Sequence, residues 1–471
     1  MKPKYSFSIK KTRLRYHNNS MDAEIVNNVK GTKDYYGESL RKRNFIIKNL
    51  SDLCVKYNFE PLQTPAFEYS KLVQNVYGDE ADKLIYHILN SGDFLKDCEI
   101  NSGDIKKIRA EISEKCLRYD LTLPLMRFVL NNIGEIDFPL KRYQCQPVWR
   151  ADRPQKGRLR EFIQFDIDIV GSESVLCENE ILLFVNDFFD DISFQQYTIK
   201  INHRKVLEDL AKLIGCEGEK CTSFFILIDK KDKIGLEGVV QGLKDLGVKE
   251  ENINILQSLF ALDCDNAIKI VHIKNIFKNA NIDTKNIDDL ENFYANYVYG
   301  KIKNVNIDFS LVRGLAYYTG LIFEVTLDDA SVGSVCGGGR YDYFANKFSK
   351  KELESVGISF GIDRLYAALE DKNLLQEKAY KKVIFAANAD NNLDFNLIRL
   401  LRKRGFIVDI YYNPEGSYSK KLRYADKKNF DFVISSEKEG EYTCRNMENG
   451  ETCFITSSKN IEDEIYTFVT N

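Results

Sequence analysis

Side chains suited to chemistry gather first in residues 138–171, whose pattern predicts a β-hairpin. Apolar and polar residues alternate there, which is typical of strands with one apolar and one polar face. The polar face of the second strand consists of Gln164, Asp166 and Asp168. The first strand has a matching face, formed by Arg142, Gln144, Gln146 and Arg150. A polar strand face often meets only solvent. Two such faces side by side, joined by a loop with Arg153, Lys156 and Arg158, instead predict a concave site for a cationic or amino substrate beside a polyphosphate.

Three glycine-containing segments are further candidates. In Arg313-Gly-Leu-Ala-Tyr-Tyr-Thr-Gly320, an Arg and two Tyr occupy a turn between strands expected over 305–312 and 321–327; this fits a structural turn as well as a functional site. The glycines of Gly337-Gly-Gly-Arg-Tyr-Asp342 let the backbone approach a ligand, although they also fit a tight turn. Residues 357–364 predict an apolar strand that turns into a helix, with Arg364 at its entry. The Gly-rich fingerprints of Rossmann and P-loop sites are absent from the sequence.

The composition is that of an ordinary globular protein. Of the 471 residues, 44% are hydrophobic and 29% are charged, which excludes collagen, coiled coil and long-range disorder. No apolar run approaches the ~20 residues that span a bilayer, so we expect no membrane association. A net charge of −3 excludes a protein that coats nucleic acid by bulk charge, but not a local basic patch.

The cysteines and histidines argue against disulfides and metal sites. Eleven scattered cysteines do not suggest a disulfide framework and favour a reducing compartment, so we predict a cytoplasmic protein. Cys216 and Cys221 have no second ligand pair nearby, and the four histidines lie far apart, so we expect no zinc or haem.

Changes in pattern divide the chain into regions. Residues 1–20 form a basic extension, which could be a transit peptide, an RNA-touching arm, a disordered terminus or sequence upstream of a start at Met21. Residues 21–207 and 301–372 form the main domain, which opens with an amphipathic helix over 40–57, and residues 208–300 form a helical insertion. After a charged linker, residues 381–471 predict a small α/β domain with a largely parallel sheet. Its strands are expected over 383–386, 406–411 and 432–435, and its helices over 393–403 and 418–427.

In this order, the segments resemble histidyl-tRNA synthetases, a family of class II aminoacyl-tRNA synthetases. The resemblance runs from about residue 28 to the C-terminus, apart from a loosely matching middle. Residues 59–68, 150–168 and 361–364 are similar to motifs 1, 2 and 3 of the class, and residues 30–34 to the family's opening segment, with Lys33 where Arg is usual. Residues 117–124, 313–320 and 337–342 are similar to segments peculiar to the histidine enzymes. The resemblance implies an α+β catalytic core on an antiparallel sheet, a helical insertion, and a C-terminal α/β anticodon-binding domain.

The resemblance also implies roles for single residues. The α-ammonium of L-histidine would be held by Asp120 and Thr122, with Leu121 between them in the pocket. The imidazole would be recognised by Asp168, Tyr317 and Tyr318, and the carboxylate by Gln164. Two catalytic cations, Arg150 and Arg313, would contact the α-phosphate and also line the histidine site. ATP would further contact Arg158 and Arg364, the latter packing on the adenine. The family usually has Asp or Asn at the position of Ala316, so the orientation of Tyr317 and Tyr318 is open.

The implied reaction needs positioned cations rather than a protein nucleophile. The histidine carboxylate attacks the α-phosphate of ATP, and Arg side chains with Mg²⁺ stabilise the charge that spreads over the phosphoryl oxygens. The histidyl group then passes to the 3′ end of tRNA(His). The similarity to motif 1 implies a homodimer.

The C-terminal region supports contact with RNA, and two other functions fit the same fold. Residues 399–428 hold nine basic and three acidic residues, interleaved with Tyr411, Tyr412, Tyr418 and Tyr424, which suits unstacked anticodon bases, although a solvated helix face explains part of it. A synthetase-like regulatory subunit should lose the catalytic Arg residues and this C-terminal region. A nucleic-acid-binding module should lose the pocket of Asp120, Thr122 and Asp168. Because all are present, we predict the enzyme.

Overall fold

The fold is described from a computed structural model of the chain. It covers residues 26–73, 76–77, 82–96, 98, 103–313, 317–328, 332–348, 352–372, 374–375, 380–386, 393–412, 416–438, 440–456 and 461–470. The basic extension over residues 1–20 lies outside these ranges. The chain forms two compact units, Met1–Gln376 and Glu377–Asn471. Among the helices of the described residues, none is long and apolar enough to cross a membrane.

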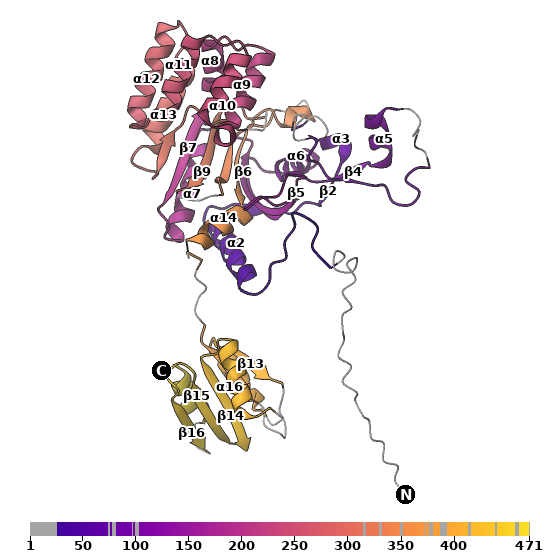
Figure 1. The fold of residues 1–471 in the computed structure, drawn as a ribbon, viewed down its shortest axis with the longest axis vertical. Helices are drawn as coiled ribbons and strands as arrows, with labels where there is room; N and C mark the ends of the chain where they lie inside the picture. Colours follow the sequence, from indigo (N-terminus) through magenta and orange to yellow (C-terminus); the bar gives the residue numbers. More distant parts are fainter. Residues whose placement is uncertain are drawn as a thin grey trace. The chain divides into compact units, whose positions relative to one another are not determined.

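An eight-stranded sheet organises the first unit (Figure 1). Its order is β1 (Glu60–Pro61), β5 (Leu140–Trp149), β6 (Glu161–Val170), β11 (Ser355–Gly361), β10 (Ser334–Arg340), β9 (Leu321–Leu327), β7 (Tyr197–His203) and β8 (Val305–Ile307). All neighbours are antiparallel except the outer pairs β1–β5 and β7–β8. The antiparallel core expected from the sequence is therefore confirmed.

Helices α2 (Glu38–Lys56), α7 (Leu176–Asp191) and α14 (Ile362–Asp371) pack on the central strands of the sheet. The predicted amphipathic helix is α2, and it buries the apolar stripe of Ile46, Leu50 and Leu53. Aromatic side chains fill the interface between helix and sheet, where the ring centroids of Phe188 and Phe360 lie 5.8 Å apart. These contacts cover one face of the central strands with packed side chains.

A smaller sheet lies in the same unit, in the order β2 (Phe67–Tyr69), β4 (Lys115–Leu117) and β3 (His87–Ile88). The helices of this part are α3 (Ser70–Val73), α5 (Ile105–Ile112) and α6 (Thr122–Asn131). The side chain of Asp120 accepts a hydrogen bond from Leu123 N in the first turn of α6, at 3.2 Å. The start of α6 therefore fixes the position of Asp120.

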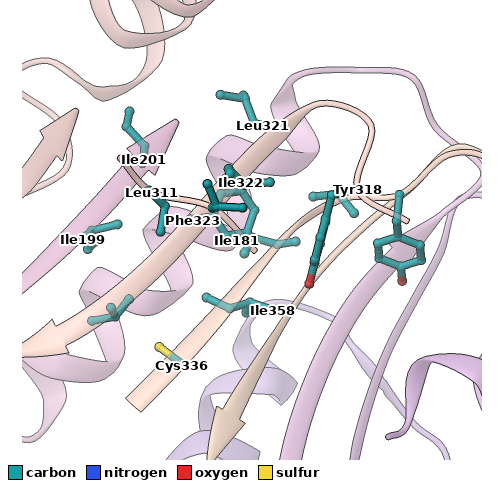
Figure 2. Packing of buried hydrophobic residues seen from close by; sticks show 14 of the residues in the cluster. Ile181, Ile199, Ile201, Leu311, Tyr318, Leu321, Ile322, Phe323, Cys336 and Ile358 are labelled. Atoms are coloured by element: carbon teal, nitrogen blue, oxygen red, sulfur yellow. The ribbon is translucent and has the colours of Figure 1, made fainter. Parts of the chain in front are cut away.

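Residues 204–298 are helical, as expected for the insertion (Figure 1). The elements are α8 (Arg204–Leu213), α9 (Glu219–Asp229), α10 (Lys231–Asp245), α11 (Glu250–Phe260), α12 (Asn266–Asn279), α13 (Lys285–Phe293) and the π-helix η2 (Tyr294–Val298). Their buried side chains join one hydrophobic cluster with those of the sheet. Figure 2 shows part of that cluster, which includes Ile181 of α7 and Ile199, Ile322, Phe323 and Ile358 of the sheet.

Two expectations for the first unit are wrong in detail. The strand expected over 305–312 ends at Ile307, because Asp308 accepts hydrogen bonds from the backbone and hydroxyl of Ser310 and the chain turns there. The glycines 337–339 lie in the middle of β10 rather than in a turn, hydrogen-bonded between β9 and β11. A Cβ on Gly338 would come within 1.9 Å of the Gly357 carbonyl oxygen, so the strands approach closely here.

The second unit has a five-stranded sheet in the order β13 (Ile407–Tyr411), β12 (Lys382–Ala386), β14 (Phe432–Lys438), β15 (Glu441–Asn446) and β16 (Thr452–Thr456). Its helices are α15 (Phe395–Lys403), α16 (Tyr418–Lys427) and α17 (Ile461–Thr470). The first three strands are parallel, as predicted, whereas β15 and β16 form an antiparallel hairpin that the sequence analysis missed.

Candidate active site

The predicted polar faces do meet on neighbouring strands. Three rows cross β5, β6 and β11: Arg142–Asp168–Gly357, Gln144–Asp166–Ser359 and Gln146–Gln164–Gly361. The hairpin and its polar surface are therefore confirmed. Most of this surface is buried instead of facing solvent, namely Arg142, Gln144, Gln164, Asp166 and Asp168. The position of β11 beside β6 was not predicted from the sequence.

Asp168 lies almost fully buried in the first row. Its Oδ2 is 2.8 Å from Arg142 Nη2, and its Oδ1 accepts a hydrogen bond from the Tyr341 hydroxyl. A Cβ at Gly357 would come within 1.9 Å of Oδ1, so glycine makes room for this carboxylate. Burial raises the pKa of Asp168, against the effect of Arg142. Tyr341 and Gly357 thus belong to the site, although only their presence in glycine-containing motifs hinted at it.

Asp166 is a second buried carboxylate behind Asp168. Burial raises its pKa to about 7, Arg142 opposes the shift, and the charge of Asp168 adds to it. Gln164 Nε2 lies 3.4 Å from Asp166 Oδ1 and also contacts the Ser359 hydroxyl. The buried guanidinium of Arg142 therefore favours the charged form of two buried carboxylates, Asp166 and Asp168.

Asp120 offers an acceptor to a ligand. Its Oδ1 receives hydrogen bonds from Tyr77 Oη at 2.7 Å and Leu123 N, while Oδ2 is buried without a hydrogen-bond partner among the described residues. Burial raises the pKa of Asp120. Burial raises the pKa of Tyr317, and Thr122 at the start of α6 opposes that shift, so the two hydroxyls are neighbours. The carbonyl of Leu121 accepts a hydrogen bond from Arg142 at 3.3 Å. An unpaired buried carboxylate oxygen beside hydroxyl groups suits an ammonium group.

The two tyrosines expected beside Asp168 are buried, with ring centroids 4.8 Å apart. The ring centroids of Tyr317 and Tyr341 lie 5.9 Å apart. Burial raises the pKa of Tyr318 and nearby Arg313 opposes that shift, so the Arg313 charge acts on this hydroxyl. Figure 2 shows Tyr318 at the edge of the hydrophobic cluster, near Ile322 and Ile358. Tyr341 therefore stands between this pair and Asp168. Ala316, the departure from the family pattern, lies outside the described residues.

The four predicted phosphate-binding cations come together. Burial lowers the pKa of Arg364, and Arg158, Arg150 and Arg313 lower it further, so their charges act on one another. Arg150 donates to Tyr119 O at 3.0 Å and to Gln164 Oε1 at 3.2 Å. All four side chains are partly exposed. Such a group of mutually repelling cations, open to solvent on one side, is the arrangement that a polyphosphate stabilises.

The backbone and nearby carboxylates hold these cations in place. Arg364 donates to the carbonyls of Gly157 and Ser334, at 3.3 and 2.9 Å. Arg158 pairs with Asp152 at 2.7 Å. Arg313 Nη1 pairs with Glu324 Oε2, also at 2.7 Å. A Cβ on Gly337 would lie 2.5 Å from Arg313 Nη1, so the first glycine of the run gives the guanidinium its space. Glu324 was not singled out in the sequence, because its role depends on β9 lying beside β10.

The arrangement contains no evident resident metal site. Among the described residues, no group of three or more His, Cys, Asp or Glu side chains is placed to hold a metal ion. All eleven cysteines fall within the described ranges, and none of them is paired in a disulfide there.

Comparison with solved structures gives the fold class. The chain is similar to histidyl-tRNA synthetase from Nostoc sp. PCC 7120, with a TM-score of 0.74, 22% identity and coverage of 94% of this chain and 99% of that one. It is also similar to an ATP phosphoribosyltransferase regulatory subunit/histidyl-tRNA synthetase from Bacillus halodurans, with a TM-score of 0.69, 19% identity, and coverage of 87% and 98%. The fold is that of a class II synthetase core followed by a small α/β domain.

Sequence comparison gives the family. A sequence model described as "Histidyl-tRNA synthetase" matches residues 109–365. A histidine–tRNA ligase of Cytophaga hutchinsonii is 40% identical over 439 residues, which cover 91% of this chain and 96% of that protein. One of Christiangramia forsetii is 40% identical over 438 residues, which cover 90% and 95%. The chain therefore belongs to the histidyl-tRNA synthetase family.

Proposed function

We propose that this chain activates L-histidine with ATP and transfers the histidyl group to the 3′ end of tRNA(His). The observation that carries the proposal is a set of buried carboxylates beside a group of Arg side chains, since the charge of Arg150 acts both on Asp120 and on Arg364. The carboxylates are those of Asp120 and Asp168, and the cations are Arg150, Arg158, Arg313 and Arg364. An amino acid that carries an ammonium group and an imidazole fits the carboxylates, and a polyphosphate fits the cations. Family membership and the names of relatives at 40% identity support the same reaction.

The residues divide the work of activation among them. The unpaired oxygen of Asp120 and the hydroxyl of Thr122 receive the α-ammonium. Asp168, whose two oxygens are fixed by Tyr341 and Arg142, presents a preset acceptor to the ring N–H. Gln164, hydrogen-bonded to Arg150, lies where a substrate carboxylate would join the cation. Arg150 and Arg313 then stabilise the negative charge that develops at the α-phosphate. ATP enters as its Mg²⁺ complex, in which the metal is held mainly by phosphates and water.

The C-terminal unit is proposed to bind the anticodon region of the tRNA. Among the four interleaved tyrosines, Tyr412 is 81% exposed and Tyr418 is 40% exposed, so their rings are open to stacking on bases. Tyr411 and Tyr424 instead pack edge to face, with centroids 5.1 Å apart. Lys421 is buried, so it adds little to a basic surface. Some residues of the predicted basic and aromatic pattern therefore pack inside the second unit. The exposed residues of that pattern form the candidate RNA surface.

We also propose a homodimer in the cytoplasm. Phe67 and Tyr69, on β2 at the edge of the small sheet, are 56% and 65% exposed and belong to or adjoin the segment similar to motif 1. Large apolar rings on an edge strand favour burial against a second chain. The free cysteines fit a reducing compartment.

Histidine-dependent exchange of pyrophosphate into ATP, followed by charging of tRNA(His), tests the function. Exchange that requires histidine and no other amino acid, together with charging, is the expected result. Histidine binding without exchange would instead support the alternative of a regulatory subunit. One of the similar solved structures is described as a regulatory subunit or a synthetase. RNA binding without either activity would support the nucleic-acid-binding alternative.

A further inference from the structure

The turn that leads to Arg313 is held by side chains from several elements. After β8 ends, Asp308 Oδ1 accepts hydrogen bonds from Ser310 N at 2.9 Å and Ser310 Oγ at 2.6 Å. Asn202, fully buried on β7, donates through Nδ2 to Leu311 O at 3.1 Å. These bonds fix the backbone two residues before Arg313. Any element that contacts this turn therefore influences where the guanidinium stands.

One such contact comes from the helical region. Lys231 opens α10, and its Nζ contacts the hydroxyl of Ser310, which is only 6% exposed. Burial alone would raise the pKa of Asp308, but Lys231, Ser310 and Lys200 lower it, so the ammonium of Lys231 also acts on the carboxylate of the turn. The same ammonium lies 5.8 Å from the centroid of Phe260 in α11. Lys231 thus connects the helices to the turn.

A second interaction, which is electrostatic, comes from the same junction of helices. Asp229 ends α9, and its pKa is raised by burial and lowered by Arg313, so the two side chains interact electrostatically. Gly235, with φ of 69°, interrupts α10 one turn after Lys231. The short stretch from Asp229 to Lys231 therefore reaches both Arg313 and the turn that carries it.

We propose that Lys231 is a positioning residue for Arg313, and that through it the helical region helps to set the rate of histidine activation. Lys231 acts by holding Ser310 and Asp308, which define the turn. The proposal rests on the proposed function and extends it to a region that contains none of the residues assigned to the substrates. Because a cation aimed at developing charge is sensitive to small displacements, loss of this contact should slow the chemical step more than it weakens histidine binding.

Lys231→Met tests this in the full-length protein, because it keeps the aliphatic stem and removes the ammonium. We expect kcat of histidine-dependent pyrophosphate exchange to fall about tenfold, with the KM for histidine changed by less than about twofold. Lys244→Met is the matched control, since Lys244 is an exposed residue of the same helix whose ion pair with Glu250 spans 3.2 Å at the surface. Lys231→Arg should restore part of the rate.

Coupling to Arg313 separates positioning from general stability. In an Arg313→Ala background, Lys231→Met should cause little further loss of kcat, because the residue that it positions is gone. Ser310→Ala removes the hydroxyl that Lys231 contacts, so it should lower kcat in the same way. This variant replaces Lys231→Met in the test if Lys231→Met does not yield folded protein. Thermal melts of every variant exclude a loss of rate that only follows unfolding.

Three results would overturn the proposal. The first is a kcat of Lys231→Met equal to that of Lys244→Met. The second is a loss of kcat on adding Lys231→Met to Arg313→Ala that is as large as in the wild-type background. The third is a lower melting temperature of Lys231→Met with full turnover per folded molecule. Each requires that the wild-type protein exchanges pyrophosphate with histidine. Absence of exchange in the wild type would instead contradict the proposed function itself.

Discussion

Arg142 and Asp168 form an ion pair across β5 and β6, with Nη2 2.8 Å from Oδ2 and both side chains less than 5% exposed. Removing one partner of such a pair leaves the other charge buried and uncompensated, which typically costs about 3–5 kcal/mol. Two further guanidinium nitrogens of Arg142 lack hydrogen-bond partners among the described residues. The carboxylate proposed to recognise the imidazole is thus also part of the stability of the sheet.

Asp168→Ala should therefore have two separable effects. The melting temperature should fall because Arg142 loses its ion-pair partner. The KM for histidine should rise far more than the KM for ATP, since a site built for a hydrogen bond loses its acceptor. Steady-state exchange and a thermal melt measure the two. Glu161→Ala, at an exposed position of the same strand, is the control. Equal increases in the KM for histidine and the KM for ATP would contradict the proposal that Asp168 recognises the imidazole.

Gly357 is expected to tolerate no side chain. In Gly357→Ala the new Cβ would overlap Asp168 Oδ1, so the carboxylate must move away from Tyr341 and Arg142. We expect a loss of about 1–3 kcal/mol in the free energy of unfolding, as for an overpacked core, together with weaker histidine binding. Gly361→Ala, four residues along the same strand, is the control, because its Cβ would meet no atom nearer than 3.5 Å. Equal behaviour of the two variants in denaturant titration and in histidine binding would refute this account of Gly357.

Asp166 should make stability depend on pH near neutrality. Its pKa is raised to about 7, so between its unfolded value near 4 and pH 7 the folded protein binds more protons at this group than the unfolded chain. The contribution of Asp166 to the free energy of unfolding should therefore fall as the pH rises through this window. Asp166→Asn removes the titration and keeps the shape. Its melting temperature relative to wild type should rise between pH 5 and pH 8, and a constant difference would show that Asp166 does not titrate in this range.

The second unit should be separable from activation. The proposed substrate residues all lie in the first unit, which has its own hydrophobic cluster, so a protein ending at residue 376 should keep histidine-dependent exchange. Charging of tRNA(His) should fall sharply because the candidate anticodon surface is gone. The oligomeric state of the truncated protein must match that of the full chain. Normal charging by such a protein would show that the second unit has another role.

Periodicity predicted the elements that line the site, but not how distant strands meet. The alternation in residues 161–170 places Asp166 and Asp168 on one face, and the hairpin loop brings Arg142 opposite Asp168. The pairing of Asp168 with Gly357 depends on β11, and the contact with Tyr341, 173 residues further along the chain, depends on the end of β10. No local pattern predicts that either segment lies beside β6. The hairpin of β15 and β16 was missed because its inward Tyr442 and Cys444 stand among polar residues typical of a loop.

Arg313 gives the sharpest test of the catalytic assignment. It stands at the end of a turn fixed by Ser310 and Asn202, it pairs with Glu324 at 2.7 Å, and it lies within the electrostatic reach of Arg364. If it stabilises charge at the α-phosphate, Arg313→Ala should lower the rate of adenylate formation about 10²–10³-fold, or about 3–4 kcal/mol. Arg313→Lys should keep the pair with Glu324 and recover only part of the rate, because an ammonium lacks the planar fork of a guanidinium.

A purely structural Arg313 leads to a different outcome. The loss of its pair would leave Glu324 largely buried without its cation, so Arg313→Ala would lower the melting temperature while each folded molecule turned over at nearly the normal rate. Single-turnover adenylate formation, measured beside a thermal melt, separates the two roles. Transfer to tRNA from supplied histidyl-adenylate should suffer less than activation, since the charge that Arg313 meets develops on the α-phosphate of ATP. A variant that loses both steps equally would place Arg313 in substrate binding common to both steps, and not in activation.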